Sequence, residues 1–152
     1  GLPIVATMTF DTHRRTMMGD TPEKAIEFTH TLPTPLVAFG ANCGAGQSML
    51  IDTIRGLARG ANDGEVIVAK GNCGVPKIED DMVVFDGTLE SIAIYGRLAR
   101  DAGARIIGGC CGTTPEHLKA LVDALDGYVP GETPDDATIE AALGPIDPPK
   151  RR

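Results

Sequence analysis

The chain has 152 residues, which is long enough for one domain with a buried core. Hydrophobic residues make up 42% of it and charged residues 23%, the proportions of an ordinary globular protein. The formal net charge of -7 argues against nucleic acid and anionic membranes as partners, because both would be repelled. No run of roughly 18 apolar residues and no signal sequence is visible, so we expect a cytoplasmic protein. Since the chain begins at Gly1 and enters an apolar run at once, we also expect it to be a piece of something longer.

Four short apolar runs alternate with segments of helical periodicity. In chain order, we expect a strand over residues 4–10, a helix over 21–32, a strand over 36–39, a helix over 50–58, a strand over 66–69, an irregular loop over 71–87, a helix over 89–96, a strand over 105–108 and a helix over 114–125. Thr21 and Thr114 should cap the helices that follow them, because each precedes a proline, which suits the first helical turn.

Strands that are apolar on both faces and separated by helices indicate a parallel sheet with right-handed crossovers. Doubly wound open sheets and closed eight-stranded barrels are both built in this way. Four such units correspond to half a barrel, since a whole barrel takes roughly 250 residues. The predicted fold class is therefore α/β, with half of a (β/α)8 barrel over residues 1–127. A turn-rich tail over 128–152 follows, with at most a short helix near 137–143.

All four cysteines follow predicted strands. Cys43 follows the second strand, Cys73 the third, and Cys110 and Cys111 the fourth. Because the carboxyl ends of parallel strands meet at one edge, the four thiols should share one rim. Thiolates gathered in a reducing compartment favour zinc; four of them would close a structural site, whereas three leave a position open for a substrate. Spacing alone leaves Cys73 as either a fourth ligand or a buried apolar filler.

Other polar residues near this rim have simpler explanations. Asp11 and His13 follow the first strand, where a loop role and a site role are equally compatible with the pattern. His117 is expected in the first turn of a helix, where it caps the helix or faces solvent. His30 stands late in a helix, where a cation is favourable without any function. The pair Cys110–Cys111 could also be a redox-active dithiol, although such pairs are usually spaced and at a helix N-terminus.

Two segments resemble the zinc-binding signature of the homocysteine S-methyltransferase family. They are GANC over residues 40–43 and GGCCGTTPEH over residues 108–117. Two further segments, ATMTFDTHRRTMMG over 6–19 and VAKGNCGVP over 68–76, are most similar to bacterial betaine-homocysteine S-methyltransferases. The resemblance runs from about residue 2 to 127 and covers strands five to eight of an eight-stranded barrel. The first four strands, which bind the amino acid part of homocysteine and much of the methyl donor in that family, have no counterpart here.

The resemblance implies a zinc-dependent transfer of a methyl group to the thiolate of homocysteine, giving methionine, with betaine as the expected donor. It implies that Cys43, Cys110 and Cys111 hold the zinc while Cys73 does not, which leaves the site open. We expect Asn42 and Asn72 to offer amides to the substrate or to the zinc ligands, and a turn-forming role is equally compatible with their positions. The expected partners are homocysteine, a small methyl donor, and either an N-terminal half-barrel chain or a second copy of this chain. The alternative is a non-catalytic, zinc-bound half-barrel that serves as a structural or assembly partner.

Overall fold

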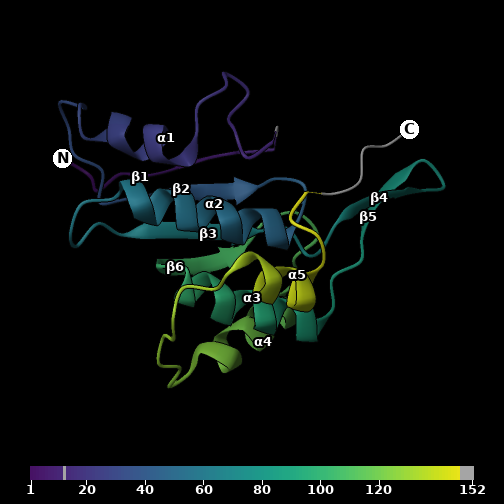
Figure 1. Cartoon of the computed structure of the whole chain (residues 1–152). Coiled ribbons are helices and arrows are strands. Elements are labelled where there is room, and N and C mark those ends of the chain that lie inside the picture. Colours follow the sequence, from purple (N-terminus) through teal and green to yellow (C-terminus); the bar gives the residue numbers. More distant parts are fainter. Residues whose placement is uncertain (12, 148–152) are drawn as a thin grey trace.

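The computed structural model describes residues 1–11 and 13–147 and consists of a parallel sheet with helices, plus a separate hairpin (Figure 1). The strands are β1 (Val5–Met8), β2 (Ala38–Cys43), β3 (Ile67–Gly71), β4 (Pro76–Glu79), β5 (Met82–Phe85) and β6 (Ala104–Gly109). The helices are α1 (Pro22–Thr29), α2 (Gln47–Gly60), α3 (Leu89–Asp101), α4 (Pro115–Leu125) and α5 (Asp136–Leu143). No helix in this part of the chain is long and apolar enough to cross a lipid bilayer.

Strands β1, β2, β3 and β6 form one sheet in that order, and every neighbouring pair is parallel. The expected alternation of strands and helices is therefore confirmed. Because each strand returns through a helix before the next one begins, the carboxyl ends of all four strands lie at one edge. This arrangement is that of part of an α/β barrel. Strand β2 continues to Cys43, well past its expected end at Phe39, so the cysteine itself is the last residue of the strand.

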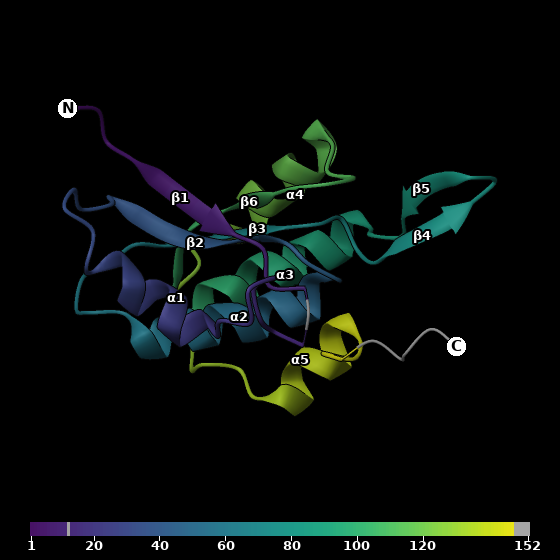
Figure 2. The same cartoon turned by 90° about the horizontal axis from the view of Figure 1, so that it is seen from above.

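The irregular loop expected over residues 71–87 is wrong, because this stretch contains the antiparallel hairpin of β4 and β5. Asp80 and Asp81 form its two-residue turn with φ of 49° and 60°, the left-handed conformation that a tight hairpin requires. Aspartate tolerates this conformation, but two aspartates are a weaker turn signal than the pairs with glycine that mark most such hairpins. The hairpin projects away from the sheet in both views (Figures 1 and 2).

Helices α1 and α4 begin where their threonines predict. The Thr21 hydroxyl accepts a hydrogen bond from the Lys24 N–H at 3.4 Å, and Pro22 is the first helical residue. At α4 the Thr114 N–H donates to Nδ1 of His117 at 3.2 Å. His117 therefore satisfies a backbone donor at the helix start, as one of its two expected roles requires.

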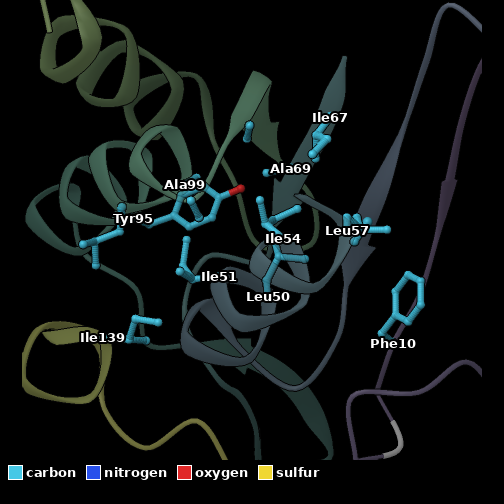
Figure 3. Close-up of a cluster of buried hydrophobic side chains, with 14 of the residues drawn as sticks. Phe10, Leu50, Ile51, Ile54, Leu57, Ile67, Ala69, Tyr95, Ala99 and Ile139 are labelled. Carbon is cyan, nitrogen blue, oxygen red and sulfur yellow. The ribbon is translucent and has the colours of Figure 1, made fainter. Parts of the chain in front are cut away.

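The core lies between the sheet and the helices α1, α2 and α3, which cover one face of the sheet, and α5 packs on the outer side of α2 and α3 (Figure 2). Tyr95 of α3 is the largest of its fully buried side chains. The close-up in Figure 3 shows Tyr95 and Ala99 of α3 beside residues of α2 and β3, with Ile139 of α5 nearby. Helix α4 packs against α3 and β6. Burial of this cluster is the main source of stability for the fold.

The opposite side of the sheet, called the open face here, is made of the alternate strand residues. Phe39 and Ala41 pack in the core, so Gly40 and Asn42 lie on the open face, since neighbouring residues of a strand point to opposite sides. The residues in register with these belong to the same face, which comprises Val5, Thr7, Ala38, Gly40, Asn42, Val68, Lys70, Ile106 and Gly108. Val5 and Ile106, on the two edge strands, are 52% and 44% exposed.

The segment after α4 packs back onto the helices. Arg55 of α2 donates to the Pro134 carbonyl at 2.9 Å and pairs with Asp136, and Ile139 is fully buried. The expected short helix is confirmed as α5, whereas the boundary between a domain and a tail at residue 127 stays a prediction. The basic run at residues 150–152 lies outside the described residues.

Replacing Ile139 with alanine tests whether the tail stabilises the fold. Ile139 is 0% exposed and belongs to the core cluster, so Ile139→Ala should lower the free energy of unfolding by about 3 kcal/mol. Val129, in the same tail, is 81% exposed, and Val129→Ala should change that energy by less than about 0.5 kcal/mol. Urea unfolding followed by circular dichroism measures both. Equal effects of the two substitutions would contradict a structural role for the tail.

Candidate metal centre

Three thiols meet at the carboxyl edge of the sheet. Cys43 ends β2, and Cys110 and Cys111 directly follow β6. The Cys43 Sγ lies 2.8 Å from the Cys110 Sγ and 3.7 Å from the Cys111 Sγ, and the last two sulfurs are 3.9 Å apart. All three cysteines are free thiols. The three sulfurs lie close enough together to bind one metal ion. In the part of the chain that the structure describes, this is the group of His, Cys, Asp or Glu side chains whose ligand atoms all lie within 4.8 Å of one another.

The two cysteine-bearing loops converge although β3 lies between their strands. Cys43, Gly71 and Gly109 are in register across β2, β3 and β6. Strands two places apart are separated by roughly 9.6 Å, so the chain must turn sharply for the thiols to meet. Cys43 and Gly44 both take the left-handed conformation, with φ of 59° and 83°. For a cysteine this conformation is uncommon, and such backbone is found preferentially at functional sites.

The loop that carries Cys110 and Cys111 is tied to the end of β3. The Cys110 N–H donates to the Gly71 carbonyl at 2.7 Å, and the Cys73 N–H donates to the Cys111 carbonyl at 2.9 Å. Gly112, with φ of 74°, lies against Phe85 of the hairpin, where a Cβ atom would come within 2.5 Å of the ring. Only glycine fits this close approach, so the hairpin braces the loop from outside the sheet.

Tyr95 joins the ends of β3 and β6 from within the core. Its hydroxyl accepts a hydrogen bond from the Gly71 N–H at 2.9 Å and donates to the Gly108 carbonyl at 3.3 Å. Burial raises the pKa of this phenol well above its ordinary value, so it stays protonated and able to donate. Sequence reasoning missed this residue, because nothing in helical periodicity separates a tyrosine with a partner from an ordinary core aromatic.

The pKa values of the Cys43 and Cys110 thiols shift in opposite directions. Burial, followed by the hydrogen bond with Cys110, raises the pKa of Cys43 to about 11. Burial also opposes ionisation of Cys110, but hydrogen bonds with the other two cysteines, together with the positive charge of Lys70, lower its pKa overall. The metal-free cluster therefore favours a thiolate at Cys110 over one at Cys43. The resulting thiolate, held by its neighbours, is ready to attract a cation.

Lys70 was also missed, although a lysine within the buried strand IVAKG is a visible exception to the apolar pattern. It lies on the open face, in register with Asn42 and Gly108 at the level just before the cysteines. Its side chain is exposed. A charge at this place favours thiolates at the rim of the sheet.

A family model described as homocysteine S-methyltransferase matches residues 1–125, which include all four cysteines and the whole parallel sheet. The chain belongs to the homocysteine S-methyltransferase family. The family match supports methyl transfer to homocysteine, and the thiol cluster supplies a possible metal site.

The other residues that the sequence analysis singled out lie either outside the thiol cluster or close to it. Cys73 is only 1% exposed, packs against Gly87 and is not part of the thiol cluster. Asp11 and His13 do not belong to the cluster either, and His30 pairs with Glu65 at 2.8 Å on the surface. Asn42 and Asn72 both lie close to the cluster.

The two asparagines differ in how their amides are used. The Asn42 amide donates to the Thr9 hydroxyl at 3.4 Å, a long contact on the open face. The Asn72 side chain is buried, and both ends of its amide bond to backbone groups of the cysteine loops. Substrate binding by either asparagine stays a prediction.

Proposed function

We propose that this chain supplies the zinc-binding half of an enzyme that transfers a methyl group to the sulfur of homocysteine, giving methionine. The three-thiol cluster inside the family match is the observation that carries the proposal. The parallel sheet would correspond to strands five to eight of a closed eight-stranded barrel. Four free cysteines and the lack of a disulfide among the described residues suit a reducing, cytoplasmic setting.

The cluster fits zinc in donor chemistry and in spacing. Sulfurs around a tetrahedral zinc with bonds near 2.3 Å lie about 3.8 Å apart. Two of the three sulfur separations, 3.7 and 3.9 Å, match this value. The third, 2.8 Å between Cys43 and Cys110, is longer than a disulfide bond of about 2.05 Å but shorter than a contact between two unbonded sulfurs, and it has to lengthen by about 1 Å to suit zinc. Three protein ligands leave one position for a substrate, which is the arrangement of catalytic rather than structural zinc sites.

The protein groups have defined tasks in this reaction. When bound, zinc supplies a Lewis acid that lowers the pKa of a coordinated thiol, so that homocysteine reacts as a thiolate at neutral pH. Cys43, Cys110 and Cys111 would hold the metal as thiolates, and their negative charges would keep a substrate sulfur at the metal rich in electrons. Lys70 partly balances these charges from the open face. The buried position of Cys73 keeps a fourth thiolate away from the site.

The choice of betaine as methyl donor rests on the resemblance of residues 6–19 and 68–76 to betaine-dependent enzymes. A quaternary ammonium group is bound best against aromatic faces. The chain has only six aromatic residues, and Phe10, Phe39 and Tyr95 are buried in the core. Most of an aromatic cage would therefore come from an N-terminal half-barrel that covers the open face.

The test of this proposal is whether the sulfur of homocysteine enters the metal site. We expect the chain loaded with Co²⁺ to show thiolate-to-metal charge-transfer bands that grow when homocysteine is added. Homoserine, which has a hydroxyl in place of the thiol, should leave the spectrum unchanged. A spectrum that does not respond to homocysteine at millimolar concentration would refute an open substrate position. It would favour the non-catalytic, metal-bound structural module instead.

A further inference from the structure

Asn72 connects the two loops that carry the metal-binding thiols. Its Nδ2 donates to the Gly44 carbonyl at 2.9 Å, directly after Cys43, and its Oδ1 accepts the Cys111 N–H at 3.3 Å. The residue is 4% exposed. One carboxamide thus spans from the end of β2 to the loop after β6, and it does so from the end of the strand between them.

The rest of the hydrogen-bond pattern shows why this bridge matters. Strands β2 and β6 are each paired with β3 and not with one another. Within the described residues, backbone hydrogen bonds tie the Cys110–Cys111 loop to Gly71 and Cys73, and none joins it directly to the loop at Cys43 and Gly44. Apart from the thiols themselves, the Asn72 side chain is the hydrogen-bonded link between the two halves of the cluster.

The thiols need such a link because metal binding requires all three to ionise. Three negatively charged sulfur ligands within 4 Å of one another repel. A cluster free to spread would have to be drawn together again by the metal, at a cost in affinity. Groups that hold metal ligands in place through a second layer of hydrogen bonds typically change metal affinity by about 10- to 100-fold.

We propose that Asn72 is a positioning residue, which latches the Cys43 loop to the Cys111 loop and so holds the three thiols at metal-binding distance. This role rests on the proposed metal site and goes beyond it, because it assigns the amide to the protein backbone rather than to a substrate. It also explains why an amide is suited to this position: the bridge needs an acceptor at one end and a donor at the other, which a carboxamide provides.

Asn72→Asp separates the latch from a simple turn-forming role. Aspartate favours turns as asparagine does and keeps the acceptor for the Cys111 N–H, but it places an oxygen against the Gly44 carbonyl in place of a donor. Asn72→Ala removes both bonds. Asn62→Ala is the matched control, because Asn62 precedes β3, at the opposite end of that strand from the cysteine loops, and its amide contacts the His30 ring at 3.2 Å.

The experiment measures zinc affinity by competition with a chromophoric chelator, and the ligand field of bound Co²⁺ by absorption spectroscopy, without any substrate. We expect Asn72→Asp and Asn72→Ala to weaken zinc binding by about 10- to 100-fold and to shift the Co²⁺ bands, and Asn62→Ala to stay within about twofold of the native chain. Circular dichroism of each metal-free variant checks that the fold is kept.

Zinc affinity within about twofold of native in folded Asn72→Asp would overturn the proposal. If Asn72→Ala does not fold, Asn72→Asp and Asn72→Ser decide the question by the same criterion. The outcome is independent of homocysteine: a native chain that binds metal but ignores homocysteine refutes the proposed function and leaves the latch standing.

Discussion

Cys110→Ser is expected to lose zinc that the native chain binds at a ratio of one per chain. Serine has nearly the same size as cysteine, but its hydroxyl is far less acidic and a much poorer zinc ligand than a thiolate. Because even residues behind the ligands change affinity by about 10- to 100-fold, loss of a ligand should cost more than about 100-fold. Cys43→Ser and Cys111→Ser should behave in the same way, as measured by metal analysis after dialysis under reducing conditions.

Cys73 supplies the control within the same chain. It precedes the hairpin at the same rim, yet its thiol is buried and outside the cluster. Cys73→Ala should therefore keep one zinc per chain, although it leaves a small cavity. Loss of zinc from this variant would mean that a fourth thiolate completes the site, and the open position would disappear. A native chain that contains no zinc but forms a reversible disulfide would favour the dithiol alternative.

Zinc affinity should also rise with pH. The pKa of Cys43 is raised to about 11, so at neutral pH the metal has to displace its proton. A ligand thiol that is protonated in the free chain and ionised in the complex makes binding weaker as the pH falls. We expect a change of at least about tenfold per pH unit below neutrality, measured by chelator competition. A zinc affinity that does not change with pH would indicate that the thiols are already ionised in the metal-free chain.

Methionine formation is expected to require a second half of the barrel. The chain alone should form almost no methionine from homocysteine and betaine, because the resemblance assigns the groups that hold the amino acid moiety and much of the donor to the first four strands of the barrel. Adding a half-barrel made of the first four strand–helix units of a family member should raise the rate by at least about 100-fold, as followed by mass spectrometry. The edge strands β1 and β6 supply unpaired backbone groups for its attachment.

Two controls make this result specific. The same mixture with Cys110→Ser should be inactive. Light scattering should show the isolated chain as a dimer or larger species, which becomes a one-to-one complex when the half-barrel is added. Turnover by the chain alone at the rate of the mixture would show that the second half is unnecessary. A zinc-bound complex that forms but makes no methionine with betaine, a folate or a sulfonium donor would support the structural alternative.

Much of the fold was predictable because its signals are local. The apolar runs and the Thr-Pro helix starts at Thr21 and Thr114 depend on a few neighbouring residues, and the structure confirms these starts. The hairpin over β4 and β5 was missed, although β5 is an apolar run, because its Asp-Asp turn lacks the glycine that marks most tight hairpins. The extension of β2 to Cys43 was missed because GANC has a loop-like composition, and pairing with β3 overrides it.

The candidate site was predictable in part. That Cys43, Cys110 and Cys111 belong near one edge follows from the parallel order of strands, and the thiol distances agree. Spacing alone left Cys73 open, although the family resemblance implied its exclusion. That exclusion and the parts taken by Asn72 and Tyr95 depend on where side chains point after the strands end. Such directions are set by loop dihedral angles and by packing against residues distant in the chain, for which periodicity carries no signal.

By itself, then, the sequence determined the alternation of strands and helices and the edge at which the thiols collect, since these depend on residue order and on the handedness of the crossovers. Only the tertiary structure decided which thiols touch. The left-handed turn at Cys43 and the Asn72 bridge across β3 bring three sulfurs together. The fourth sulfur, that of Cys73, is buried by packing and stays outside the cluster. These choices belong to contacts between segments that are 30 to 70 residues apart, as in the separation of 67 residues between Cys43 and Cys110.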